Sequence, residues 1–137
     1  MNEYLVDTNV ILDVIGADPV FGPRSRASLE SLAQNGVLVI NPIIYAEVGA
    51  FAGSLEELDE LLPTTLFRRD ALPWEASFLA GQAFRRYRRN GGRKSRILAD
   101  FLIGAHAAAA GCVLVTRDRG HLRHFKLTAL DPSTGAV

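Results

Sequence analysis

Several features are scarce in this chain, and each scarcity narrows what the protein can be. Among its 137 residues there is one cysteine, Cys112, so no disulfide can form within the chain. No apolar run approaches the roughly 20 residues that a membrane-spanning helix needs. The N-terminus carries an acid, Glu3, and lacks the basic segment of a secretory signal. We therefore expect a cytoplasmic protein with no membrane segment.

Net charge is also lacking, because 15 Lys and Arg residues balance 15 Asp and Glu residues. The balance conceals an uneven distribution: arginines gather at 85–96, whereas acids gather at 56–60. Arginine suits planar, bidentate contact with phosphate. The basic stretch therefore indicates a nucleic-acid surface, although an arginine-rich helix end can equally be a solvated face that offsets the helix dipole.

Length and composition predict one compact domain. A chain of 137 residues, 48% of them hydrophobic, is long enough for one core and too short for two domains. We expect this domain to span residues 1–132. A flexible tail is expected at 133–137, because the sequence after Asp131-Pro132 looks loose.

Short apolar runs alternate with helical patterns along the chain. The expected strands are 4–6, 37–40, 65–67, 112–115 and 127–130. The expected helices are 10–15, 24–34, 42–51, 54–62, 73–89, 95–110 and 121–125. This alternation predicts a three-layer α/β fold with a mainly parallel central sheet. Sites in such folds form beyond the carboxyl ends of the strands.

Local signals add detail to two of these helices. Asn9 or Thr8 is expected to cap the first helix, and Ser54 with Glu57 matches a capping box.

The helix over 73–89 offers apolar side chains for burial, namely Trp74, Phe78, Leu79, Ala83, Phe84 and Tyr87.

Four acids beside apolar sequence carry the chemical signal. Asp7 directly follows an expected strand and Asp118 comes shortly after another, whereas Glu47 and Asp100 lie on helices. One such acid alone is usually a helix cap or a solvated side chain, but four are harder to dismiss. Gathering carboxylates costs free energy through repulsion, which hard cations such as Mg²⁺ or Mn²⁺ offset. Such a cation beside a basic surface favours phosphodiester hydrolysis by an activated water.

Four short motifs contain these acids, in the order Val6-Asp7-Thr8-Asn9, Tyr45-Ala46-Glu47-Val48, Ala99-Asp100-Phe101-Leu102-Ile103-Gly104-Ala105-His106-Ala107 and Val115-Thr116-Arg117-Asp118. Their order and spacing resemble the PIN domain family, and the chain length is similar to that of VapC-type toxins of VapBC toxin–antitoxin systems. The resemblance covers essentially the whole chain. It implies an α/β/α PIN-like fold and a Mg²⁺- or Mn²⁺-dependent endoribonuclease that cleaves RNA of the translation machinery. It also implies a cognate VapB-type antitoxin and a homodimer.

The resemblance assigns roles by position. The acids that hold the metal or position the attacking water would be Asp7, Glu47, Asp100 and Asp118. Thr116 would support them through its hydroxyl, and Asn9 would either orient Asp7 or, as we favour, cap the helix. Phe101 departs from the commonest form of the third motif, where a small residue is frequent, so the local packing there is open.

Basic and titratable residues near the motifs are weaker candidates. The expected RNA contacts are Arg117, Arg119, Arg93 and Arg96. Asp13 is expected on the surface or in a helix pair, and His106 in a structural role. His121 or His124 would contact RNA or act as an acid or base near neutral pH, although a metal site does not require either.

Two other functions remain open. A PIN domain kept as an RNA-binding or regulatory module without catalysis would bind RNA and leave it intact. A receiver-type signalling domain would need an acidic pair after the first strand and a lysine after a late one. Here Asp7 stands alone, and Lys94 and Lys126 are unsuitably placed.

Overall fold

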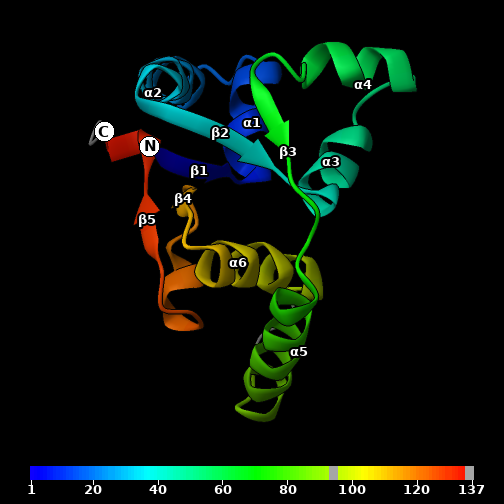
Figure 1. Ribbon diagram of the computed structural model, residues 1–137, viewed down its shortest axis with the longest axis vertical. Helices are drawn as coiled ribbons and strands as arrows, with labels where there is room; N and C mark the ends of the chain where they lie inside the picture. The colour runs from blue at the N-terminus through cyan, green and yellow to red at the C-terminus, as the bar shows by residue number, and fades with distance from the viewer. Residues whose placement is uncertain (93–95, 135–137) are drawn as a thin grey trace.

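The computed structural model describes residues 1–92 and 96–134 and contains a five-stranded sheet. The strand order is β3-β2-β1-β4-β5, and every neighbouring pair is parallel (Figure 1). The strands are β1 (Asn2–Val6), β2 (Gly36–Ile40), β3 (Phe67–Arg69), β4 (Val113–Val115) and β5 (Thr128–Leu130). The expected α/β fold with a parallel sheet is confirmed.

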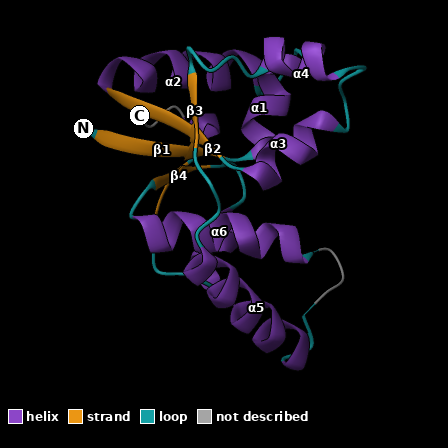
Figure 2. Cartoon of the chain, turned by 45° about the vertical axis from the view of Figure 1, so that its right-hand side comes forward, coloured by secondary structure: helices purple, strands orange, loops and turns teal. Residues whose placement is uncertain are grey.

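Helices cover both faces of the sheet, so the molecule has three layers. Helices α1 and α2 lie on one side and α5 and α6 on the other (Figure 2). The helices are α1 (Thr8–Ile15), α2 (Gly22–Asn35), α3 (Pro42–Gly49), α4 (Leu55–Leu61), α5 (Trp74–Arg89) and α6 (Leu98–Ala110). Two 3₁₀ helices, η1 (Arg119–Arg123) and η2 (Pro132–Thr134), follow. No helix in the described parts of the chain is both long and apolar enough to cross a bilayer.

The sheet supplies the main core. Its central strands are apolar on both faces, as in a parallel sheet covered by helices, and Leu5, Val39 and Leu114 have no exposed surface. A second, smaller cluster joins α5 to α6. There Phe101 is buried, with its ring centroid 5.4 Å from that of Phe84, so this large residue is accommodated between the two helices.

The outer face of α5 differs from the expectation. Trp74 and Phe78 are 91% and 65% exposed, so the prediction that they are buried is wrong. Leu79 is also exposed. The helix buries Ala76 and Ala80 against α6 instead. Small residues at helical spacing let two helices approach closely, and the bulky side chains then face outward.

Several element boundaries also differ from the expectation. The third strand begins at Phe67, because residues 64–66 form a turn in which the N–H groups of Leu66 and Phe67 donate to the Pro63 carbonyl. Other differences are α3 ending at Gly49 before Phe51, α6 beginning at Leu98, and η1 covering Arg119–Arg123 instead of 121–125. The expected start of α6 at Ser95 lies outside the described residues.

Hydrogen bonds hold the start of α4 at Ser54 and the 3₁₀ helix η2 at Ser133. Ser54 Oγ accepts from the Glu57 N–H at 3.1 Å, as expected of a helix cap. The Glu57 carboxylate accepts from Gly53 instead of from Ser54. Ser133 lies in η2, and its carbonyl accepts from the Arg24 side chain of α2. The domain limit at 132 and a tail beginning at 133 stay predictions.

Candidate functional site

Asp7 lies at the junction of β1 and α1, and its backbone ties two strands together. The Asp7 N–H donates to the Val115 carbonyl at 2.9 Å, at the carboxyl ends of β1 and β4. Its carboxylate Oδ1 accepts from the Thr8 N–H at 2.7 Å. Asp7 is therefore the N-cap of α1, and the expectation that Asn9 or Thr8 caps this helix is wrong.

The second carboxylate oxygen of Asp7 lies in a buried polar network. Oδ2 accepts from Thr116 Oγ1 at 2.8 Å and from Asn9 Nδ2 at 3.3 Å. The Thr116 hydroxyl in turn accepts from the Asp118 N–H at 2.9 Å. Asn9 and Thr116 thus orient Asp7, and Thr116 also links Asp7 to the loop that carries Asp118.

Glu47 projects from α3 toward Asp7, with Thr8 between them. The Thr8 hydroxyl donates to Glu47 Oε1 at 2.7 Å, while the Thr8 N–H donates to Asp7. Burial and the charges of Asp7 and Asp100 raise the pKa of Glu47, against the opposing effect of the Thr8 hydrogen bond. Asp7 after β1 and Asp100 on α6 therefore lie close enough to Glu47 on α3 for their charges to act on it. Sequence reasoning named Thr8 only as a possible helix cap and not as a partner of Glu47, although it stands beside Asp7 in the first motif.

Asp100 lies in the first turn of α6 and is half-buried. Its Oδ2 accepts from the Ile97 N–H at 2.9 Å, which fixes the start of the helix. The positive end of the helix dipole favours a carboxylate at this position.

Asp118 forms an ion pair with an arginine. Its Oδ2 accepts from Arg96 Nη1 at 2.8 Å, and its Oδ1 accepts from the Gly120 N–H at 2.8 Å. Burial alone would raise the pKa of Asp118, but the hydrogen bonds from Arg96 and Gly120 hold it below its ordinary value. Asp118 therefore stays ionised and already has a strong partner.

His121 is buried between two of the acids. Its Nε2 lies 3.2 Å from Asp7 Oδ2 and 3.6 Å from Asp118 Oδ2. Its Nδ1 has no hydrogen-bond partner in the described parts of the chain. Gly104 makes room for the ring, because an added Cβ would lie 3.0 Å from His121 Nδ1 and closer still to Phe125. His121 was only a weak candidate from the sequence, where its single signal was its place three residues after Asp118.

The arginines expected to contact RNA differ in their partners and in their exposure. Arg117 forms a bidentate ion pair with Asp13 at 2.7 and 2.9 Å. Asp13 is buried, so its expected surface position is wrong, but the expected helix-pair role is confirmed, because Asp13 on α1 accepts from Ser25 of α2. Arg117 also joins α1 to the loop after β4. Arg119 is 69% exposed and Arg96 binds Asp118. The expected contact at Arg93 lies outside the described residues.

His106 has the structural role expected of it. Its Nδ1 lies 2.9 Å from Asn41 Nδ2, and Asn41 caps α3 by accepting from the Ile44 N–H. Burial lowers the pKa of His106, against a small opposing effect of Asp70, so the ring is neutral in the folded protein near pH 7.

The acidic cluster fits a hard divalent cation in its chemistry. The donors are carboxylate oxygens, and the pKa of Glu47 is raised first by burial and then by the charges of Asp7 and Asp100, a repulsion that such an ion offsets. Among the described residues, no three Asp, Glu, His or Cys side chains converge closely enough to enclose a metal. Mg²⁺ keeps several waters and takes one or two protein carboxylates, so it does not require such an enclosure.

A model of the PIN domain family matches residues 4–126. The chain belongs to this PIN domain family. No curated protein is significantly similar in sequence. The motifs named above all lie inside the matched region, so the family model covers the acidic cluster and the strands β2, β3 and β4, whereas β5 lies beyond it.

Solved structures share the PIN fold of this chain. VapBC2 from Rickettsia felis, bound to a DNA fragment from its promoter, has a TM-score of 0.74 at 23% identity over 94% of this chain and 98% of that chain. FitAcB from Neisseria gonorrhoeae has 0.70 at 24% over 94% and 97%. VapBC-1 from nontypeable Haemophilus influenzae has 0.71 at 22% over 96% and 98%. At these identities the similarity establishes the fold.

Proposed function

We propose that this PIN domain is a Mg²⁺- or Mn²⁺-dependent endoribonuclease, the VapC-type toxin of a toxin–antitoxin pair. One observation carries the proposal: Thr8 donates to both Asp7 and Glu47, at 2.7 Å each, so two acids from separate segments are held together, and the charges of Asp7 and Asp100 add to burial in raising the pKa of Glu47. Three acids from separate segments would not be kept within reach of one another for stability, because their repulsion is unfavourable. Binding of a divalent cation is the function that such an arrangement supports best.

The residues of the cluster have distinct roles in this proposal. Asp7, Glu47 and Asp100 are the acids that would hold the ion, which when bound would supply an activated water and stabilise charge on the cleaved phosphate. Thr116 and Asn9 fix the orientation of Asp7 through its Oδ2. The Thr8 hydroxyl donates to Glu47 and so holds its carboxylate near Asp7.

Asp118 has a different part in the reaction. Its carboxylate stays ionised and holds Arg96, while His121 lies between Asp118 and Asp7. These contacts place two cationic or hydrogen-bonding side chains beside the acids. We propose that Asp118 completes the catalytic set by orienting Arg96 toward the substrate phosphate.

The proposed partners follow from the family resemblance. They are an RNA of the translation machinery as substrate, a VapB-type antitoxin as inhibitor, and a second copy of the chain. The VapBC complexes of R. felis and H. influenzae, which share the fold, support the antitoxin. Co-expression with the protein encoded by a small neighbouring gene should relieve any growth arrest that this chain causes.

Substitution of single acids tests the site. In a cleavage assay with Mn²⁺, we expect Asp7→Asn and Asp100→Asn to reduce RNA cutting to the level seen with EDTA. Glu56→Gln is the matched control, because Glu56 is an exposed acid on α4 outside the cluster. If Asp7→Asn cuts RNA as fast as the unmodified chain, the assignment is wrong.

A catalytically silent RNA-binding module is the second candidate. The Arg96–Asp118 ion pair favours it, because that pair occupies one of the four acids. This module would bind RNA equally well with EDTA or Mn²⁺ and leave the strand intact. Cleavage that depends on Mn²⁺ and on Asp100 would rule it out.

A further inference from the structure

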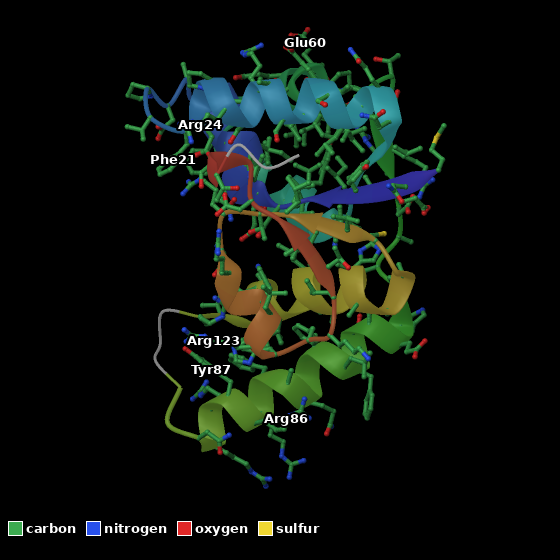
Figure 3. All side chains as sticks on the ribbon, turned by 90° about the vertical axis from the view of Figure 1, so that its left-hand side faces the viewer. Phe21, Arg24, Glu60, Arg86, Tyr87 and Arg123 are labelled. Carbon is green, nitrogen blue, oxygen red and sulfur yellow. The ribbon has the colours of Figure 1, made fainter. Side chains whose placement is uncertain are left out.

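A cleft of about 930 Å³ opens beside Asp118, between the C-terminal end of α5 and η1. Figure 3 places Arg123 of η1 directly over Tyr87 of α5, two residues that line it. The volume is near the upper end of the range of about 300–1,000 Å³ that is usual for ligand pockets. The cleft therefore has room for a short piece of an extended chain.

The charge of the cleft is positive. Arg86, Arg96 and Arg123 line it, and the single acid in the lining, Asp118, is already bound by Arg96. Within the described parts of the chain, neither Arg86 nor Arg123 forms an ion pair. Burial lowers the pKa of His124, and the nearby charges of Arg96, His121 and Arg123 lower it further, against the opposing effect of Asp118. The cleft is suited to an anion.

Aromatic rings share the cleft with these arginines. The rings of Tyr87 and His124 meet edge to face, with centroids 5.4 Å apart. Both rings also pack on Phe101, at 5.3 and 4.8 Å, so their positions are fixed from behind. Arginines interleaved with aromatic rings are how proteins bind single-stranded nucleic acid, through phosphates and stacked bases.

The cleft leads directly to the acidic cluster. At its inner end Arg96 contacts Asp118 at 2.8 Å. From Asp118, His121 Nε2 is 3.6 Å away, and the same atom lies 3.2 Å from Asp7. A strand lying in the cleft would therefore continue toward Asp7.

We infer that this cleft binds an unpaired segment of the RNA substrate next to the cleaved phosphodiester. Arg86 and Arg123 contact its phosphates, and Tyr87 and His124 contact its bases. The inference rests on the proposed nuclease function and narrows its substrate class to RNA with unpaired nucleotides at the cut. Double-stranded RNA is read across its wide minor groove by an extended surface, so a cleft of this size suits a single strand instead.

Fluorescence anisotropy with a short labelled oligouridylate, in EDTA so that the strand stays intact, tests this binding. The test variant is the double substitution Arg86→Gln with Arg123→Gln. The matched control is Arg85→Gln with Arg89→Gln, which removes the same charge from exposed residues of α5 that do not line the cleft. We expect the cleft variant to bind about tenfold or more weakly, with a salt dependence shallower by about 1.4 logarithmic units per decade. The control should stay within about twofold of the unmodified chain.

Three results would overturn the inference. An equal loss in both double variants would mean that general surface charge binds the RNA. A perfectly paired hairpin that binds as tightly as the single strand would remove the argument for unpaired nucleotides. An acidic peptide that depends on Arg86 and Arg123, when RNA does not, would make the cleft a protein-binding site.

Cleavage kinetics separate this inference from the proposed function. If the unmodified chain neither binds nor cuts RNA, the proposed function itself fails. If it cuts RNA and the cleft variant cuts with an unchanged KM, only the cleft assignment fails. A raised KM with a nearly unchanged kcat is the expected result, because the two arginines bind the strand away from the cleaved bond.

Discussion

Glu47 carries its charge against burial and against the charges of Asp7 and Asp100. Replacing it with glutamine removes that repulsion and keeps an oxygen that accepts from Thr8. We therefore expect Glu47→Gln to raise the melting temperature in EDTA by about 2–4 °C. The same variant should lose most of the stabilisation that Mn²⁺ gives the unmodified chain. Differential scanning fluorimetry measures both, with Glu56→Gln as control. A lower melting temperature in EDTA would contradict the account.

His106 gives the folded protein a dependence on pH. Because burial lowers its pKa, the unfolded chain takes up a proton near pH 6.5 that the folded chain resists. The contribution of neutral His106 to the free energy of unfolding is therefore fully present above about pH 6.5 and is lost as the pH falls toward the lowered pKa.

The urea midpoint should accordingly fall between about pH 7 and about pH 5, and fall less in His106→Gln. His124 also has a lowered pKa and acts in the same direction, so His124→Gln is the comparison variant. Identical pH slopes for the unmodified chain and His106→Gln would exclude His106 as a source.

The Arg117–Asp13 ion pair makes a separate contribution to stability. Asp13 is 5% exposed and also accepts from Ser25, whereas the Arg117 side chain is 27% exposed. Removing one charge leaves the other poorly compensated, so we expect Asp13→Asn to lower the free energy of unfolding by about 2 kcal/mol. Urea denaturation measures the change, with the exposed Glu30→Gln as control. A loss below about 0.5 kcal/mol would make the pair energetically unimportant.

Single residues were predictable from sequence where a local pattern marked them. Asp7 and Asp118 follow apolar runs, and the structure places both at strand ends. His121 and Asp13 were undervalued because their partners are remote: His121 meets Asp7 across 114 positions, and Arg117 meets Asp13 across 104. Such pairings depend on the order of strands in the sheet, which the local sequence does not specify.

At the level of elements, α5 shows that two faces of one helix contribute differently to stability. Ala80 has no exposed surface against α6, whereas Trp74 is 91% exposed. We expect Trp74→Ser to change the free energy of unfolding by less than about 0.5 kcal/mol. Ala80→Leu should cost about 1–3 kcal/mol, because its methylenes have no space. If Trp74→Ser were the more damaging, Trp74 would have to be covered by a second molecule.

Element prediction was reliable for the buried strands and weaker for helix faces. The continuous apolar runs of β1, β2 and β4 have no other stable location than a covered sheet. On α5 both faces carry apolar residues, and hydrophobicity alone predicts that the bulky ones are buried. In the structure the alanines are buried instead, because close packing on Phe101 needs small partners.

Across the whole molecule, sheet order gathers the acids. β1 lies between β2 and β4, so Asp7 at its end is flanked by the segments that lead to α3 and to Asp118. Glu47 arrives on α3 and Asp100 on α6, from opposite sides of the sheet (Figure 1). The four motifs predicted this PIN fold. They did not predict that Asp118 is paired with Arg96, or that a basic cleft lies beside it.

Restoration of activity by metal tests the central claim most directly. The purified chain is stripped with EDTA, the chelator is removed, and cleavage of a labelled RNA with unpaired loops is followed as Mn²⁺ is added back. We expect no cleavage before the addition, recovery with rising Mn²⁺, and no recovery in Asp100→Asn. Cleavage by the stripped chain, or equal recovery in Asp100→Asn, would contradict a metal-dependent nuclease at this site.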